Sequence, residues 1–497
     1  MNLTEIASLI PPGSQAFLVG GTVRDLLLGR PTADMDIATD ADPEALARAI
    51  AARLGGTSFA LDAQRGVYRA VLPSGLHVDV SGFQGDIESD LRRRDFTVNA
   101  MAVTLTPPSP LSHKRARGVR DQNSPLPAVG EGQGVRGVID PTGGRADLGA
   151  RLIRAVSEEN LESDPLRLLR AFRLSSALGF RIEEETLRRI EKHAGLITEA
   201  SAERVRDELY LILNAPGAAR AFRAMWDVGL LRRILPETAP MEGLPQSEPH
   251  RYDLLDHSLK ATEYAEEVIA EPGIYFGDRA EAVKEYLAEA VDGDLTMAGL
   301  VKLCALLHDS GKPSRMSFEG DRIRFTGHDE AGALLNAAIA ERLKLSNRAA
   351  DVLEKTARHH MRPLHMTKGQ LSRHALYRYV RDVQPDLPAL LIVALGDAFA
   401  TREKPDAAST DIEGVALAAA EYYYGEFLKE REKPLVRGQD LIAVFGMKPG
   451  PVFGRILEEV EEKRAEGVLG DREAALRYIR ENMSRFTDRR FGRDDTF

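Results

Sequence analysis

Two short motifs near the N-terminus constrain this chain of 497 residues most strongly. Gly20 and Gly21 are followed by Arg24, and Asp34 and Asp36 come about a dozen residues later. A glycine pair that opens a helix exposes backbone N–H groups at the positive end of the helix dipole, which suits a phosphate. Two carboxylates two residues apart on a strand project from one face and suit a shared Mg²⁺ ion. The motifs together predict a triphosphate and metal site in a mixed α/β fold.

The residues around these motifs predict short alternating elements. Asp42 followed by Pro43 is typical of a helix cap and a first helical position. Asp79 lies in an alternating stretch, residues 77–80, that is typical of a strand. It is therefore a candidate third carboxylate for catalysis. Strands are expected at 16–19, 35–38, 67–72, 76–80 and 98–105, and helices at 23–28 and 43–54.

Beyond the first hundred residues the pattern changes twice. Residues 107–136 are rich in Pro, Gly, Ser and Arg without periodicity, which predicts a disordered surface insertion in the head. Its basic run at 114–117 is either a polyanion contact or a solvated loop. From about residue 160 onward, apolar residues recur at helical spacing. The chain is expected to divide into a head at 1–150, a helical neck and body at 151–245, a second domain at 246–430 and a helical tail at 431–497.

Composition excludes several classes of protein. Lys and Arg total 66 against 76 Asp and Glu, a net charge of −10 that argues at first sight against a nucleic-acid partner. That average hides arginine clusters at 92–94 and between 151 and 181. The single cysteine, Cys304, excludes an intramolecular disulfide and a cysteine-built metal site, and we expect it in the core. The absence of a signal-peptide pattern and of a long apolar run predicts a cytoplasmic protein without a membrane span.

The glycine and aspartate motifs belong to a longer resemblance. LVGGTVRDLLLGRPTADMDIAT, residues 18–39, resembles the head domain of class II tRNA nucleotidyltransferases, the family of CCA-adding enzymes and bacterial poly(A) polymerases. Similar blocks follow in family order at residues 92–100, 139–148, 164–172 and 201–208. The resemblance implies an α+β protein, with a mixed-sheet head like that of polymerase β and an all-α neck and body.

The resemblance also implies roles for single residues. Asp34 and Asp36 would hold Mg²⁺. The nucleotide would contact the remaining matched residues of the head, with Asp95 favouring a ribonucleotide over a deoxyribonucleotide. These residues are Gly20, Gly21 and Arg24 for the triphosphate, and Arg94, Asp95 and Asn99 for the ribose and phosphates.

Base selection is implied for Asp164 and Arg167. They are three residues apart, which we expect to place them on one helix face. A carboxylate acceptor beside a guanidinium donor pairs with the edge of cytosine or adenine as a template base would. Arg170 and Arg173 are either helix salt bridges or contacts to the phosphates of nucleotide and tRNA.

Two departures from the family pattern bear on specificity. Ser163 stands where the family usually has an acidic residue. Residues 60–66 replace a Lys-His-Gly-Thr-type loop, whose loss accompanies family members that add only two cytidines. CC addition and CCA addition both stay open, and poly(A) synthesis is an alternative because poly(A) polymerases share these motifs. Alternatives of another class are a non-catalytic RNA-binding protein on a transferase fold and a phosphohydrolase active only in the second domain.

Histidine and aspartate recur through the second domain in a series typical of a metal centre. Imidazole and carboxylate ligands together suit Mn²⁺, Fe²⁺, Ni²⁺ or Co²⁺. The series resembles the all-α HD phosphohydrolase superfamily over residues 250–400, which implies phosphatase and 2′,3′-cyclic phosphodiesterase activity for RNA 3′-end repair. Lys312 is either a phosphate ligand or a surface ion pair. The implied ligands are His257, His308, Asp309 and Asp397 for a first metal, and His328 with either His359 or His360 for a second.

The tail, residues 438–457, resembles that of bacterial family members. Helix N-termini after Gly/Pro turns contact RNA phosphates without reading sequence, which makes Lys448 and Arg455 RNA-binding candidates. A helical hairpin that only packs is the alternative. Altogether we expect a tRNA nucleotidyltransferase that uses CTP and ATP. It would bind the acceptor stem and 3′ end of tRNA, and add CMP, with or without AMP, without a nucleic-acid template.

Overall fold

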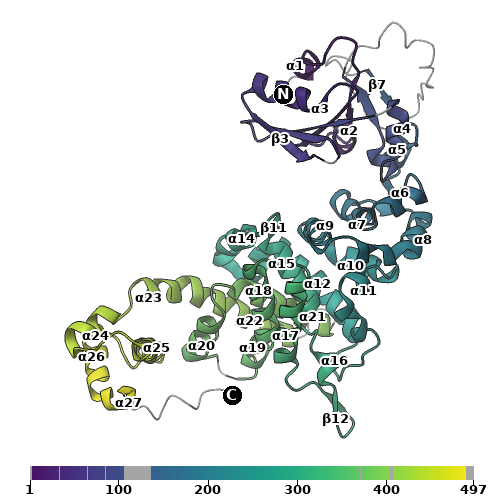
Figure 1. The fold of residues 1–497 in the computed structure, drawn as a ribbon. Coiled ribbons are helices and arrows are strands. Elements are labelled where there is room, and N and C mark those ends of the chain that lie inside the picture. Colours follow the sequence, from purple (N-terminus) through teal and green to yellow (C-terminus); the bar gives the residue numbers. More distant parts are fainter. Residues whose placement is uncertain are drawn as a thin grey trace. The chain divides into compact units, whose positions relative to one another are not determined.

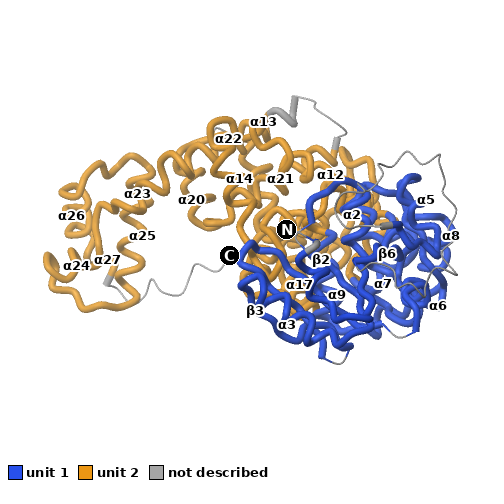
Figure 2. The backbone as a smooth tube through the Cα atoms, turned by 90° about the horizontal axis from the view of Figure 1, so that it is seen from above, with its two compact units in different colours: residues 1–212, 224–234 blue, residues 213–223, 235–497 orange. Residues whose placement is uncertain are grey.

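The computed structural model describes residues 3–32, 34–63, 65–83, 85–105, 136–369, 371–402 and 407–487 (Figure 1). They form two compact units (Figure 2). Unit 1 comprises Met1–Ile212 and Ala224–Ile234, and unit 2 comprises Leu213–Arg223 and Leu235–Phe497. The insertion predicted at 107–136 lies outside the described residues up to residue 135, and residue 136 begins a strand.

Unit 1 begins with a seven-stranded sheet in the order β3-β4-β5-β2-β1-β6-β7. Only β2 and β5 pair in parallel, so the sheet is mixed, as expected. All four residues of β1 are buried, which places this strand in the core. The strands are β1 (Ala16–Val19), β2 (Asp34–Thr39), β3 (Thr57–Asp62), β4 (Val67–Val71), β5 (His77–Gly82), β6 (Ala102–Thr104) and β7 (Arg136–Ile139).

The helices of the head follow local signals. At α3 the Asp42 carboxylate accepts hydrogen bonds from the backbone N–H groups of Glu44 and Ala45, and the helix ends at Gly55 with φ 73°. The predicted start and end of this helix are therefore confirmed. The strand predicted at 98–105 is too long, because residues 97–99 form a 3₁₀ turn before β6. The helices are α1 (Leu3–Ala7), α2 (Gly21–Leu27), α3 (Pro43–Leu54), α4 (Ile87–Leu91) and α5 (Gly144–Gly149).

Helices dominate after the head. A parallel two-stranded ribbon, β8 (Leu152–Ile153) with β9 (Arg181–Ile182), accompanies α7. The helices are α6 (Glu158–Ser163), α7 (Leu166–Leu178), α8 (Glu184–His193), α9 (Ala202–Asn214), α10 (Ala218–Asp227) and α11 (Leu231–Ile234).

Unit 2 is built around α12 and α21, which pack along each other, and around the pair α17 and α18. Cys304 on α15 is buried, as expected. Two short antiparallel ribbons, β10–β11 (Ala290–Asp292, Leu295–Thr296) and β12–β13 (Ser317–Glu319, Arg322–Arg324), interrupt the helices and were not predicted. The helices are α12 (Leu254–Ala270), α13 (Pro272–Phe276), α14 (Ala280–Ala288), α15 (Met297–Leu307), α16 (Lys312–Arg315), α17 (His328–Arg342), α18 (Asn347–His359), α19 (Met361–Met366), α20 (Arg373–Val383), α21 (Leu387–Arg402), α22 (Ala407–Tyr422) and α23 (Leu428–Glu432).

The tail has a hydrophobic cluster of its own, which includes Leu441, Ile456 and Ile479. Its helices are α24 (Gly438–Phe445), α25 (Pro451–Ala465), α26 (Arg472–Glu481) and α27 (Met483–Thr487). Within the described part of the chain, no single helix is long and apolar enough to cross a membrane; α20 and α21 meet that test only as a pair bent by 108°.

Candidate active sites

The parallel pairing of β2 with β5 collects the acidic residues of the head. It places Asp36 opposite Asp79 and Asp34 opposite His77. Asp34 is exposed, and its carboxylate lies 3.2 Å from Nδ1 of His77. Asp79 accepts two hydrogen bonds from Arg69, at 2.7 and 2.8 Å. The charge of Asp79 is therefore balanced by Arg69, and Asp34 has His77 as a neighbour, whereas Asp36 remains without such a partner among the described residues.

Within the described part of the chain, Asp36 is a carboxylate whose charge is not balanced by a direct partner. Among the described residues it has no hydrogen bond to its carboxylate and no ion pair. Burial raises the pKa of Asp36; Arg94 opposes this effect, and Asp79 and Asp34 add to it. A group held in this way gains from a divalent cation, which would remove the repulsion between the carboxylates.

Gly20 brings the backbone up to this carboxylate. Its φ of 67° lies in the left-handed region, where a side chain is strained. A Cβ atom here would lie 2.9 Å from Nη1 of Arg94 and 3.0 Å from Oδ2 of Asp36. The chain therefore needs glycine at this position to keep the space between Arg94 and Asp36 open.

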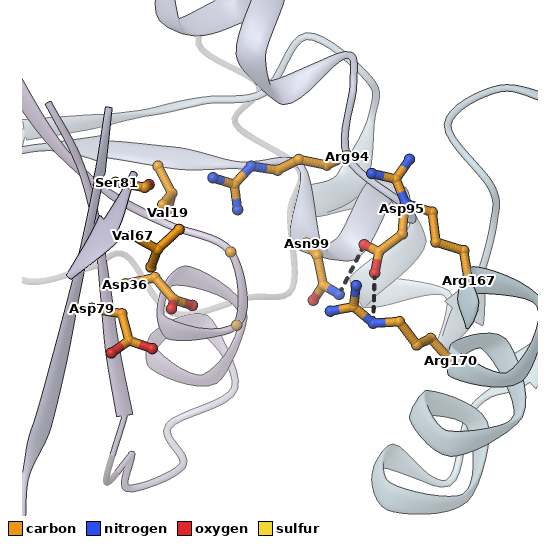
Figure 3. Close-up of a pocket in the computed structure, with 12 residues that line it drawn as sticks. Val19, Asp36, Val67, Asp79, Ser81, Arg94, Asp95, Asn99, Arg167 and Arg170 are labelled. Atoms are coloured by element: carbon orange, nitrogen blue, oxygen red, sulfur yellow. Dashed lines mark hydrogen bonds and ion pairs between the residues drawn. The ribbon is translucent and has the colours of Figure 1, made fainter. Parts of the chain in front are cut away.

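These residues line a pocket of about 300 Å³ in unit 1 (Figure 3). The strand carboxylates Asp36 and Asp79 lie on one side of it, and arginines lie on the other. This opposition of charges suits a nucleotide whose phosphates carry a metal ion. Of the predicted residues, the pocket brings together Gly20, Gly21, Asp36, Asp79, Arg94, Asp95, Asn99, Arg167 and Arg170.

Asp95 connects this pocket to the neck helices. Its carboxylate accepts hydrogen bonds from the Phe96 N–H at 2.8 Å and the Asn99 amide at 3.3 Å, and lies 3.4 Å from Nε of Arg170. Burial by itself raises the pKa of Asp95, but Arg170, Phe96 and Asn99 outweigh it and lower the pKa. Asp95 thus stays ionised and fixes the side chains around it.

Arg170 and Arg173 share a further carboxylate, Glu208, which the sequence analysis did not single out. Arg170 lies 3.7 Å from it and Arg173 lies 3.3 Å from it. Of the two alternatives left open for Arg173, the geometry favours the salt bridge, because its side chain is only 22% exposed. Glu208 stands in the quoted block 201–208, and only the fold shows that it lies against α7.

Arg24 lies outside the pocket lining. Its guanidinium donates to both carboxylate oxygens of Asp25, at 2.9 and 2.8 Å, and to the Asn99 side chain at 2.8 Å. It lies against Gly21, with Nη2 3.3 Å from the position of a Cβ there. Arg24 therefore positions the Asn99 side chain and packs against the glycine turn.

The expectation that Asp164 and Arg167 share a helix face is wrong. Asp164 follows α6 in an extended conformation, with φ −146°, and α7 begins only at Leu166. The physical reason is Pro165, because the residue before a proline is disfavoured in the helical region. Asp164 lies 3.4 Å from Arg204, and Arg167 lines the pocket while donating to the backbone carbonyls of Arg93 and Asn160.

The second centre lies in unit 2, where three predicted histidines share one arrangement. Nδ1 of His308, His328 and His360 lies 2.7–2.8 Å from the backbone carbonyl three residues earlier. Each Nδ1 therefore donates, which makes Nε2, the other ring nitrogen, the candidate metal ligand. The three Nε2 atoms and Oδ1 of Asp309 are buried without a hydrogen bond among the described residues. Donor atoms of this kind fit a transition metal.

Asp309 lies between two groups of these ligands. Its Oδ2 is 3.2 Å from His308 and 3.9 Å from His257, and its Oδ1 is 3.3 Å from His328 and 3.4 Å from His360. Burial by itself lowers the pKa of His308, but Asp309 and Asp397 outweigh it and raise the pKa to about 10. The excess negative charge of this cluster is what a bound cation would neutralise.

Of the two neighbouring histidines His359 and His360, the structure places His360 in the cluster. His359 belongs to none of the metal-ligand groups among the described residues. Burial and then Arg362 lower the pKa of His359 to about 4. Successive residues at a helix end point about 100° apart, so only one of the two faces the centre.

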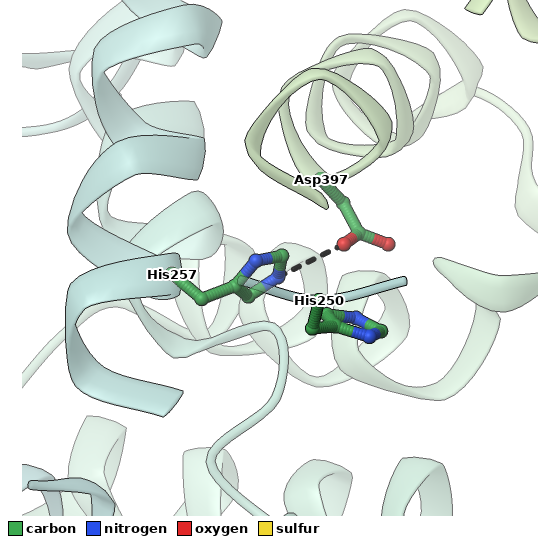
Figure 4. Close-up of side chains that lie close together, drawn as sticks. All are labelled: His250, His257 and Asp397. Carbon is green, nitrogen blue, oxygen red and sulfur yellow. Dashed lines mark hydrogen bonds and ion pairs between the residues drawn. The ribbon is translucent and has the colours of Figure 1, made fainter. Parts of the chain in front are cut away.

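His250 is a residue of this centre that the sequence analysis missed. Its ring lies 5.1 Å from that of His257, and it forms a third possible ligand group with His257 and Asp397 (Figure 4). His257 in turn lies 3.0 Å from Asp397. His250 precedes α12 in an irregular segment, so no helical spacing marks it.

Lys312 is a buried partner of Asp309, at 2.5 Å, and not a surface ion pair.

The two tail candidates remain accessible. Lys448 is exposed, and Arg455 is exposed while donating to the Phe486 carbonyl at 3.3 Å. Their role in binding RNA stays a prediction.

Family models match along the chain. A poly(A) polymerase head domain model matches residues 16–83 and 64–154. A model described as a probable RNA- and SrmB-binding site of polymerase A matches 179–242, and an HD domain model matches 254–402.

Relatives match over almost the whole length. An A-adding tRNA nucleotidyltransferase of Deinococcus radiodurans is 35% identical, covering 94% of this chain and 95% of the relative. A CC-adding tRNA nucleotidyltransferase of Thermus thermophilus is 34% identical, covering 93% of each.

Solved structures share the fold. One CCA-adding enzyme without ligand aligns with a TM-score of 0.64 at 21% identity, over 96% of this chain and 92% of that one. A Thermotoga maritima CCA-adding enzyme complexed with tRNA aligns with a TM-score of 0.59 at 20% identity, over 97% and 99%.

Proposed function

This chain belongs to the tRNA nucleotidyltransferase family of CCA-adding enzymes and poly(A) polymerases, and we propose that it adds CMP to tRNA 3′ ends. One observation carries the proposal. Asp36 lines a pocket whose other wall is cationic, and Asp34 lies two residues before it on the same strand. The proposed partners are CTP, ATP and the acceptor end of tRNA, and the proposed cellular location is the cytoplasm.

The proposed metal of this site is Mg²⁺, held by Asp34 and Asp36. Bound there, the metal would supply activation of the 3′-hydroxyl of the primer and stabilisation of the leaving pyrophosphate. The protein's own residues orient the nucleotide. Arg94 would contact the phosphates, Asp95 and Asn99 would contact the ribose, and Arg167 would face the base, whereas Asp164 lies outside the pocket lining and pairs with Arg204.

The nucleotide added is the finer part of the proposal. The sequence of residues 60–66 supports CC addition, because it replaces the loop of full CCA-adding members. The A-adding relative, 35% identical, favours a second candidate, addition of a single AMP. Both candidates make this chain one of two enzymes needed for a complete CCA end.

A primer assay distinguishes these candidates. Purified protein receives tRNA ending at the discriminator base, in C or in CC, with CTP, ATP or both. CC addition predicts extension of the first two primers and a stop at CC even with ATP present. Extension of only the third primer by one AMP establishes A addition. Continuation to CCA, or a long A tail, contradicts both partial activities.

We also propose that the HD centre hydrolyses phosphoesters at RNA 3′ ends. His257, His308, Asp309 and Asp397 would hold one Mn²⁺, Ni²⁺, Co²⁺ or Fe²⁺ ion, and His328 and His360 a second, with Asp309 shared. These residues would hold the metal, which would supply activation of water and polarisation of the phosphoester. The free Nε2 atoms of three histidines support this proposal.

The two proposed activities are tested separately. Asp34→Ala should abolish nucleotide incorporation and leave hydrolysis of cytidine 2′,3′-cyclic phosphate intact, because the two centres lie in different units. His308→Ala should abolish this hydrolysis and leave nucleotide incorporation intact. Incorporation that survives Asp34→Ala would refute the assignment of the head, and hydrolysis that survives His308→Ala would refute that of the HD centre.

A further inference from the structure

An aromatic side chain is exposed on β3, the edge strand of the head sheet (Figure 1). Phe59 is 51% exposed, and among the described residues its ring has no ring-stacking and no cation–π contact. A single exposed apolar side chain is common at protein surfaces and has no meaning by itself. The position of Phe59 in the sheet is what connects it to the candidate active site.

The register of the sheet places Phe59 in one cross-strand row with the carboxylates of the head. Asp36 of β2 pairs with Asp79 of β5, and Asp79 pairs with Arg69 of β4. Arg69 in turn pairs with Phe59 of β3. Residues directly opposite each other on neighbouring strands have their side chains on the same face of the sheet. Phe59 therefore lies on the face that carries Asp36 and Asp79.

Direct contacts connect this row to the pocket of unit 1. The Arg69 guanidinium donates to both carboxylate oxygens of Asp79, at 2.7 and 2.8 Å, and Asp79 lines the pocket. Val67, two residues before Arg69 on β4, lines it as well. Neighbouring strands are about 4.8 Å apart, so the backbone at Phe59 lies about 10 Å from that at Asp79. Phe59 thus adjoins the pocket without lining it.

The reaction of the head needs a second substrate beside the nucleotide. The 3′-hydroxyl of the tRNA has to reach the metal site at Asp34 and Asp36 while the nucleotide occupies the pocket. On one side of β2, strand β1 leads into the glycine turn, and on the other side the sheet extends over β5 and β4 to β3. Proteins hold single-stranded RNA ends by stacking their bases on aromatic side chains. The exposed ring of Phe59 lies on this second side.

We propose that the ring of Phe59 stacks on the 3′-terminal base of the tRNA primer and so holds the primer's 3′-hydroxyl at the carboxylates. Every base has a π face, so the contact reads no sequence and suits a primer end that changes when a nucleotide is added. Arg69, fixed by Asp79, would lie under the nucleotide between the ring and the metal site. The inference rests on the proposed transferase function and names a positioning residue for its second substrate.

Removing the base and removing the ring together test the stacking contact. Filter binding to the full-length protein, without nucleotide, compares tRNA ending in C with the same tRNA whose terminal nucleoside lacks its base. Wild type should bind the abasic tRNA about tenfold more weakly, as expected for one base stacked on an aromatic side chain. In Phe59→Ala this ratio should approach one, and in Phe59→Trp it should stay at the wild-type value. The matched control Phe318→Ala removes an exposed ring of β12 in unit 2 and should keep the wild-type ratio.

Kinetics and sedimentation provide the outcomes that would overturn the assignment. Phe59→Ala should raise the KM for tRNA about tenfold and leave the KM for the nucleotide unchanged. A wild-type abasic ratio in Phe59→Ala, or a higher KM for the nucleotide alone, would refute the stacking contact. A wild type that sediments as a dimer, with Phe59→Ala as a monomer, would show instead that a second copy of this chain covers the ring.

Failure of the transferase proposal gives a different result. If the wild type incorporates no nucleotide into any tRNA, the proposed function of the head is wrong. The abasic ratio is measured without turnover, so it still tests the contact between Phe59 and the terminal base.

Discussion

At the scale of single residues, neighbouring side chains serve different parts of the molecule, and His359 and His360 are the clearest pair. Changing His360 to alanine should lower the metal content of the purified protein, because its free Nε2 faces Asp309 at 3.4 Å. His359→Ala should keep the wild-type content, since His359 belongs to none of the metal-ligand groups among the described residues. Mass spectrometry of bound metal measures both. Loss of metal in His359→Ala with retention in His360→Ala would reverse the assignment.

Asp36 makes a second prediction at this scale. Asp36→Asn keeps the shape of the side chain but removes the charge that would hold Mg²⁺ at the pocket, so incorporation of CMP or AMP should fall by about a thousandfold or more. Single-turnover incorporation into a radiolabelled tRNA measures the loss. Asp227→Asn changes an exposed carboxylate of the same unit and should keep the wild-type rate. A residual rate within tenfold of wild type would remove Asp36 from the catalytic machinery.

A site residue could be predicted from the sequence where its partners lie within a few residues of it along the chain. Asp34 and Asp36 are two residues apart on one strand, so their shared face follows from the sequence. The predicted helical position of Asp164 was wrong because Pro165, the next residue, disfavours a helical conformation at Asp164. His250 and Glu208 reach their sites through contacts far apart in sequence, and no periodicity marks either of them.

At the scale of secondary-structure elements, close backbone packing at α5 makes one prediction. A Cβ on Gly144 would lie 2.0 Å from the Thr97 carbonyl oxygen, a backbone atom that cannot move aside, whereas Gly149 in the same helix has no atom within 4 Å. Gly144→Ala should destabilise unit 1 by about 1–3 kcal/mol or more, and Gly149→Ala by less than about 0.5 kcal/mol. Urea unfolding measures both. Equal stability of the two variants would contradict the close contact.

A buried ion cluster between α18 and α21 gives a pH-dependent prediction. Asp386 is fully buried and lies 2.6 Å from Lys355, with Arg348 as a second partner. Burial by itself raises the pKa of Asp386, but Arg348 and Lys355 outweigh it and lower the pKa. A depressed pKa in the folded state contributes stability above the unfolded value of about 3.9 and loses it as the pH falls further.

Asp386→Asn should therefore cost about 3 kcal/mol at pH 7, and the difference from wild type should narrow below about pH 4. Thermal unfolding at pH 7 and pH 3.5 measures the change. Asp321→Asn, an exposed carboxylate in unit 2, should show no difference at either pH. A constant difference across this pH range would mean that the ionisation of Asp386 does not stabilise the fold.

The elements themselves were predictable where local signals and burial agree. The cap at Asp42 and Gly55 fixes both ends of α3. β3, at the edge of the sheet, escaped prediction because Phe59 and Leu61 are half exposed and the strand is defined only by its pairing with β4. The 3₁₀ turn at 97–99 was not predicted, and the hydroxyl of its Thr97 donates to Asp147, a partner 50 residues away that no local pattern indicates.

At the scale of the whole molecule, the net charge of −10 has to be reconciled with an anionic substrate. The net charge does not describe the individual sites, where carboxylates such as Asp79, Asp95 and Asp386 are each paired with an arginine. Free cations such as Lys448 and Arg378 are left exposed in unit 2. Contact with tRNA should therefore depend on a small number of positions, and its salt dependence should reveal each of them.

The tail supplies the measurement for this idea. The logarithm of the affinity for a nucleic acid falls linearly with the logarithm of salt concentration, with a slope close to one per phosphate contact. Lys448→Ala should weaken tRNA binding and reduce this slope by about one, measured by filter binding between 50 and 200 mM salt. Lys284→Ala removes an exposed lysine that pairs with Glu281, and should leave the slope at its wild-type value. If Lys448→Ala also leaves the slope unchanged, Lys448 contacts no phosphate, and the α24–α25 turn only packs within the tail cluster.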